Sequence, residues 1–336
     1  MDGGRVGRRL AGRASRAPTD VEAATASCGE GGIVALTGFP FPVTTSRSGI
    51  AAGMRIAART RVAHDLLRRA LGFTPRFSLE VLDRDDWWRH APTAAYGVAH
   101  IAGPAAACTT ERANAEEAGK AGRPTGPGAG SRRLIAGVGP ADAWQEVSDH
   151  FARRLAAPAI TALVRVHGRD PVNGRGPALH ALSEVLVAHD VAHLLAEQAG
   201  LSFPRRWLAE TFANLALIAV LAESDPPGLR LVGSLADAAA TLDDALPTLG
   251  DFDGQSATVD AFASVLAQLA ITRRAYIAYA WGGTGTLAQM VSLFRGAHRE
   301  PDADHELGRW LSSRVHPAIA TIPAQFSSAQ RFDLAA

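Results

Sequence analysis

Cysteine is scarce in this chain, and neither sign of charge is in excess. Two cysteines, Cys28 and Cys108, are too few for a disulfide framework. With 34 basic and 33 acidic residues the net charge is +1, so we expect no nucleic acid and no membrane surface as a partner. The longest strongly apolar run, 215–222, is far shorter than the roughly 20 residues of a membrane span, and prolines interrupt the mildly apolar segment 31–43. We therefore expect a cytoplasmic protein.

Apolar residues make up 47% of the chain, which is enough to bury a sizeable core. The first 53 residues show no sustained hydrophobic period, and Met54 comes just before the first convincing helical pattern, 56–71. We expect residues 1–53 to be a disordered or spurious extension, dispensable for folding. The rest divides into an N-terminal α/β part, 54–178, and a helical part that carries the functional motif, 179–330.

The hydrophobic patterns predict an α+β fold, with a small N-terminal mixed sheet accompanied by helices and a mainly helical C-terminal half. Strands are expected at 76–83, 96–101 and 105–109, a long flexible loop at 111–131, and a helix at 142–155. Further helices are expected at 179–198, 204–223, 229–246, 256–281, 286–294 and 306–315.

Two histidines four residues apart are the main chemical signal. His189 and His193 would stack on one face of a helix, with Cβ atoms about 6 Å apart, so both imidazoles can chelate one metal ion. They continue the stripe of Leu182, Leu186 and Ala196, which turns them inward. The alternative is a pair of core histidines that hydrogen-bond to other groups without metal.

The following helix supplies candidate partners. Gly200 and Pro204 predict a chain reversal, and the midpoint between His193 and Glu210 falls inside it. In an antiparallel hairpin, Glu210 would then face His193, and Asn214 would face the other imidazole. Two polar groups on so apolar a helix need partners. A metal ligand and a supporting hydrogen bond would satisfy both, as would direct hydrogen bonds to the histidines without metal.

The segment resembles the gluzincin branch of the zinc metallopeptidases. The resemblance rests on His189-x-x-x-His193 followed by Trp-Leu-Ala-Glu-Thr-Phe-Ala-Asn at 207–214, and it covers residues 179–223. It implies a zincin-like fold, a zinc cofactor and a peptide or protein substrate.

By the same resemblance, His189, His193 and Glu210 would be the zinc ligands, with water in the fourth position, and Asn214 would orient His189. Asp190 stands where that family has Glu, the general base that takes the proton of the metal-activated water. Aspartate has the same chemistry but a shorter reach, and misplacement by about 1 Å can cost on the order of a hundredfold in rate. We therefore expect a metallopeptidase-like protein with weakened or lost hydrolysis.

Two other functions fit the residues. One is a zincin-like scaffold that keeps the metal for binding or structure without catalysis. The other is a metal phosphohydrolase, because His189-Asp190 also resembles the doublet of HD-domain enzymes, which need a further upstream histidine and a downstream aspartate. The candidates for those two positions are His150, His167, Asp225 and Asp237.

Candidates for a transition-state stabiliser in a peptidase are Tyr276, Tyr279, His298, His305 and His316.

Overall fold

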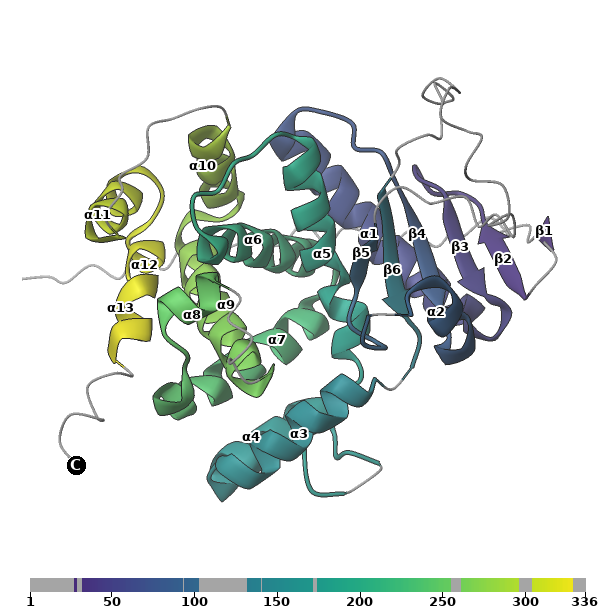
Figure 1. Ribbon diagram of the computed structural model, residues 1–336, viewed down its shortest axis with the longest axis horizontal. Coiled ribbons are helices and arrows are strands. Elements are labelled where there is room, and N and C mark those ends of the chain that lie inside the picture. Colours follow the sequence, from purple (N-terminus) through teal and green to yellow (C-terminus); the bar gives the residue numbers. More distant parts are fainter. Residues whose placement is uncertain are drawn as a thin grey trace, which may run out of the picture.

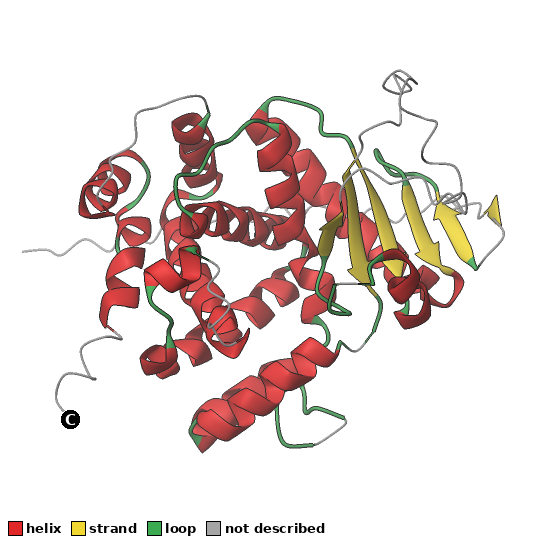
Figure 2. Ribbon diagram, viewed as in Figure 1, coloured by secondary structure: helices red, strands yellow, loops and turns green. Residues whose placement is uncertain are grey.

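The protein is an α+β structure with a small mixed sheet on one side and a larger body of helices on the other (Figures 1 and 2). The computed structural model describes residues 27–28, 32–92, 94–102, 132–139, 141–171, 174–254, 261–295 and 304–328.

The sheet is built from short strands of the N-terminal side. In chain order they are β1 (Ser27–Cys28), β2 (Ile33–Leu36), β3 (Val43–Ser46), β4 (Phe77–Leu82), β5 (His100–Ala102) and β6 (Arg132–Gly137). Their order across the sheet is β1-β2-β3-β4-β6-β5. Strands β3, β4 and β6 run parallel, whereas β5 pairs antiparallel with β6 at the edge. The sheet therefore ends in a three-residue antiparallel strand next to the helical body.

The expectation for residues 1–53 is wrong over their second half. Strands β2 and β3, the short helix η1 (Arg47–Gly49) and the first turn of α1 all lie there, and β3 pairs with β4 inside the sheet. Four-residue strands are too short to show a hydrophobic period, which is why the sequence did not reveal them. Residues 1–26 lie outside the described part of the chain.

The other strand predictions had mixed outcomes. The strand expected at 76–83 is confirmed as β4, and the one expected at 96–101 is found later and shorter, as β5. Strand β6 was not predicted. The strand expected at 105–109 and the loop expected at 111–131 fall outside the described residues.

Most helices are found where the hydrophobic pattern predicts them. The early ones are α1 (Ile50–Leu71), α2 (Arg84–His90), α3 (Asp142–Arg154) and α4 (Ala157–His167), of which α2 and α4 were not predicted. The later ones are α5 (Leu182–Gln198), α6 (Arg206–Ser224), α7 (Pro226–Ala239), η2 (Ala240–Ala245), α8 (Leu249–Asp253), α9 (Ala261–Gly282), α10 (Thr284–Phe294), α11 (Asp304–Arg314), α12 (Pro317–Ala320) and α13 (Ile322–Ser328). Of these, α8, α12 and α13 were not predicted.

The turn between α5 and α6 forms as its sequence predicts. Gly200 adopts a φ of 70°, a left-handed conformation that glycine accepts without strain, and the Leu201 amide donates to the Ala196 carbonyl.

Helix α6 then runs through the middle of the helical body. Among the described helices it is the one whose length and composition would suit a membrane span, and 78% of its most apolar window is buried inside the protein.

One hydrophobic core joins the two parts expected from the sequence. Its buried members run from Leu36 in β2 to Phe326 in α13, and helix α1 packs against both the sheet and helices α5 and α6. The boundary expected near residue 178 therefore marks a change of secondary structure, not a gap between separate cores.

Deleting residues 1–46 should abolish cooperative folding. The deletion removes β2 and β3 and with them Leu36, Phe41 and Val43, all buried in the main core. Each side chain contributes roughly 1.5–3 kcal/mol, a large part of a typical folding free energy of about 5–15 kcal/mol. Thermal unfolding followed by circular dichroism measures the effect, with deletion of residues 1–26 as the control. A shared midpoint for the two truncations would contradict the assignment of β2 and β3 to the core.

Candidate metal centre

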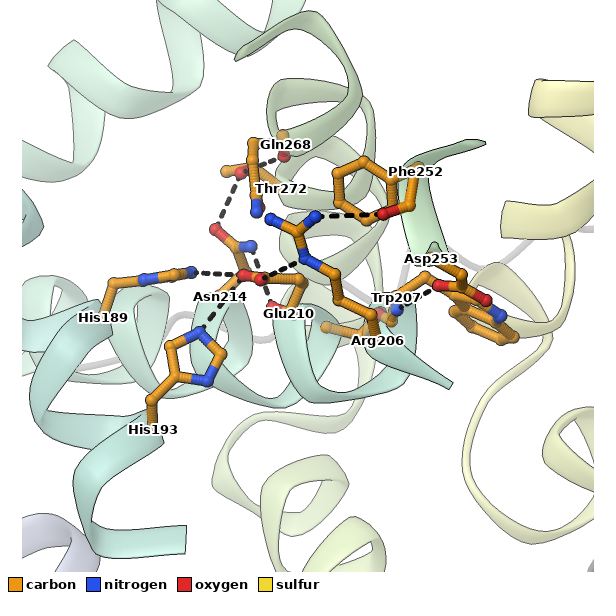
Figure 3. Close-up of polar contacts among 11 residues, drawn as sticks. His189, His193, Arg206, Trp207, Glu210, Asn214, Phe252, Asp253, Gln268 and Thr272 are labelled. Atoms are coloured by element: carbon orange, nitrogen blue, oxygen red, sulfur yellow. Dashed lines mark hydrogen bonds and ion pairs between the residues drawn. The ribbon is translucent and has the colours of Figure 1, made fainter. Parts of the chain in front are cut away.

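Three side chains from two helices meet at one point. His189 and His193 project from successive turns of α5, and Glu210 projects from the second turn of α6 (Figure 3). The Glu210 Oε2 atom lies 3.3 Å from His189 Nε2 and 3.1 Å from His193 Nε2. All three candidate ligand atoms lie within 4.8 Å of one another. Among the residues that the structure describes, these three form the group of histidine and acidic side chains close enough to hold a metal ion.

These distances fit a tetrahedral zinc site. Ligand bonds of about 2.0–2.1 Å place neighbouring ligand atoms about 3.3 Å apart in a tetrahedron. The two measured separations are close to that value. The three candidate ligand atoms come from two helices and lie close enough together for one ion to contact all of them.

The carboxyl group of Glu210 is buried yet held ionised. Burial raises its pKa, but hydrogen bonds from His189 and His193 and their charges outweigh burial and hold the pKa far below its usual range. For His189, burial lowers the pKa, but the hydrogen bond to Glu210 and the charges of Asp190 and Glu210 together outweigh burial, so the pKa is raised above its usual value. The three residues supply a carboxylate and two imidazoles, which in their deprotonated forms are a donor set suited to zinc.

Helix α6 crosses α5 steeply instead of running alongside it (Figure 1). One carboxylate therefore reaches both turns of α5, and the side-by-side hairpin geometry expected from the sequence is not found. The predicted pairing of Glu210 with His193 is present, at 3.1 Å. The hydrogen bond from Asn214 to His189 that the sequence predicts is not found, because the Asn214 side chain bonds to Glu210 and Thr272 instead.

Asn214 ties α6 to α9. Its amide donates to the Glu210 carbonyl at 2.9 Å, and its Oδ1 accepts from the Thr272 hydroxyl at 2.7 Å (Figure 3). Thr272 also donates to the Gln268 carbonyl one turn earlier in α9. Asn214 therefore supports the helix turn that carries Glu210.

The sequence analysis missed a second support, Arg206, one turn before Glu210. Its Nε lies 3.5 Å from Glu210 Oε1, and its guanidinium lies 4.7 Å from the centre of the Phe252 ring. It also donates to the Phe252 carbonyl at 3.0 Å, and the Trp207 amide donates to Asp253. The four-residue spacing to Glu210 was a signal that could have identified Arg206.

Asp190 follows His189 on α5, and the charges of His189, His193 and Glu210 all act on its carboxyl group. With His189 it lines a cavity of about 290 Å³, which the side chains of His193 and Glu210 do not line. Burial raises the pKa of Asp190, although the charges of His189 and His193 oppose that rise. The centre thus has a titratable carboxyl group on the wall of the adjoining cavity.

The other candidates from the sequence have separate environments. Tyr276 is 42% exposed, and His316 accepts a hydrogen bond from the Ala318 amide at the start of α12. Tyr276, Tyr279 and His316 do not line this cavity. His298 and the side chain of His305 lie outside the described part of the chain.

The residues nominated for a phosphohydrolase make other contacts. His150 stacks on Phe262, His167 lies 3.0 Å from the Ser234 hydroxyl, Asp225 binds Arg59, and Asp237 lies 3.3 Å from Arg273. None of them belongs to the group formed by His189, His193 and Glu210.

Comparisons of the chain with family models, with curated proteins and with solved structures find no match.

Replacing Thr272 with valine should destabilise the protein by about 1–3 kcal/mol, because Asn214 Oδ1 would be left buried without its donor. Thr211→Val is the matched control. Both threonines donate to a carbonyl four residues earlier at 2.7 Å, but only Thr272 also serves Asn214. Denaturant unfolding measures both variants, and equal losses would mean that the bond to Asn214 contributes nothing.

Proposed function

We propose that this protein is a zinc-dependent metallopeptidase-like hydrolase, with His189, His193 and Glu210 as the metal ligands. The observation that carries the proposal is the convergence of the three ligand atoms beside a cavity that also contains a carboxyl group. Zinc bound there would lower the pKa of a coordinated water and polarise a substrate carbonyl.

Asp190 is the group we assign to proton transfer. It is the carboxyl group among the described residues that line the cavity, and it sits beside His189 on the same helix. A general base acts best when its pKa is close to the working pH, and burial moves the pKa of Asp190 in that direction. The aspartate side chain is one methylene shorter than glutamate, so the reactive carbonyl must come close to α5.

The sheet edge supports a peptide as the substrate. Strand β5 is bonded to β6 on one side, and no described strand pairs with its other side. The residues just before β5, 97–99, line the cavity that holds His189 and Asp190. An extended peptide added to this edge would therefore run past the candidate centre.

The zincin-like arrangement is part of the same proposal. Its support is the packing of helix α5 against the antiparallel edge strand β5 and its neighbour β6, although helices α3 and α4 lie between β6 and α5 in the chain. Helix α1 packs behind α5 and α6.

A non-catalytic zinc scaffold is the second candidate function. It is favoured by the short Asp190 side chain and by the positions of Tyr276, Tyr279 and His316, which do not line the cavity. It uses the same metal ligands, so proton transfer is the point at which the two functions differ.

Protein purified without chelator should contain one zinc ion per chain. His189→Ala and Glu210→Gln should each lose the stoichiometric zinc, because a ligand is removed in both. His180→Ala is the matched control, since His180 is exposed near the start of α5 and outside the ligand group. Elemental analysis reads the result. Zinc-free wild-type protein that stays metal-free after dialysis against zinc would overturn the proposal.

If the protein is a working peptidase, Asp190→Asn should lower hydrolysis of an unfolded protein substrate by at least about a hundredfold, within the range typical of general acid-base catalysis. Zinc content should be unchanged, because Asp190 is not a ligand. Asp190→Glu should lower the rate less, since it keeps a carboxylate in a site fitted to the shorter residue. Zinc-loaded wild type with no more hydrolysis than Asp190→Asn would favour the scaffold instead.

A further inference from the structure

The cavity beside the candidate centre is walled mainly by apolar side chains. Helices α3, α5, α7 and α9 each contribute, for example Trp144, Leu186, Leu235 and Val265, and the segment 97–99 closes another side. Among the lining residues the titratable groups are His189 and Asp190. The titratable side chains therefore lie together at one place on a wall that is otherwise mainly apolar.

We infer that this cavity selects the substrate by taking one bulky apolar side chain, aliphatic or aromatic, next to the bond that is cleaved. The inference rests on the proposed function and extends it to the class of substrate.

The size of the cavity supports this occupant. A cavity of about 150 Å³ lined by Leu, Ile and Phe is large enough to bind benzene. The cavity here measures about 290 Å³, so a phenyl or branched aliphatic group fits with space for neighbouring atoms. A charged substrate side chain would lose its hydration on entering the cavity, and most of the wall offers it no partner of opposite charge.

Three polar atoms on lining residues favour a peptide over a pure hydrocarbon. Trp144 Nε1, Ser183 Oγ and Gln268 Oε1 are buried without a hydrogen-bond partner in the described part of the protein. They provide a donor, a hydroxyl and an acceptor. A peptide brings amide donors and acceptors together with its apolar side chain, and small side-chain shifts would let it satisfy these atoms.

The location connects the cavity to the reaction. His189 belongs both to the ligand group and to the cavity wall. A side chain seated in the cavity would therefore hold its own backbone beside the metal ligands and Asp190.

Two zinc-binding probes that differ only in their apolar end test the inference. The zinc-loaded full chain is titrated with acetohydroxamic acid and with 3-phenylpropanehydroxamic acid by calorimetry. Both bind metal through the same hydroxamate, so the ratio of their dissociation constants measures what the added benzyl group contributes to binding. Burying a side chain of that size should tighten binding by about tenfold to a hundredfold.

Val265→Trp fills the cavity from α9 and should bring the ratio of the two dissociation constants close to one. Val166→Trp is the matched control, because Val166 lies on α4 and is 43% exposed. Ala143→Phe fills the cavity from α3 and replaces Val265→Trp if circular dichroism shows that variant to be unfolded.

The outcomes separate the two proposals. Stoichiometric zinc and binding of acetohydroxamic acid with a ratio near one in the wild type would overturn the apolar cavity and leave the metal centre standing. An unchanged high ratio in the cavity-filling variants would also overturn it, since the phenyl group would then bind elsewhere. Failure to bind zinc at all would overturn the proposed function, and this inference with it.

Discussion

The contact between the Glu210 carboxylate and two imidazoles is the constraint on which the helical body depends. Glu210 lies on the most deeply buried stretch of chain, between side chains that are almost entirely apolar. An ionised carboxylate in such surroundings is costly unless charged or hydrogen-bonding partners surround it. His189 and His193 supply those partners, so α5 and α6 must cross where all three side chains meet.

The elements around this crossing hold it in place. Helix α1 packs against both α5 and α6, and the Asn214–Thr272 bond ties α6 to α9. Arg206 and Trp207 bind residues of α8, which fixes the start of α6. These contacts come from segments distant in sequence, and they orient ligands that would otherwise move on a single pair of helices. A metal centre needs such support, because its affinity depends on ligands held in position.

The two faces of α5 divide the chemistry. His193 and Glu210 do not line the cavity, His189 belongs both to the ligand group and to the cavity wall, and Asp190 lines the cavity without belonging to the ligand group. In the function proposed above, metal binding would depend on the contact between α5 and α6, whereas proton transfer would depend on the cavity that α3, α5, α7 and α9 line. The same ligand group could therefore serve either proposed function, because a change at Asp190 would affect proton transfer and leave the ligand group intact.

The sequence by itself determined the local features of the site. The spacing of His189 and His193 places them on one helical face, and Gly200 and the distance along the chain bring Glu210 to His193. The tertiary structure decided the rest. The steep crossing gives Glu210 to both histidines and pairs Asn214 with a threonine 58 residues away. Strands β2 and β3 and the apolar cavity likewise depend on pairing and packing between distant segments, which hydrophobic periodicity cannot specify because it reports only which face of one element is buried.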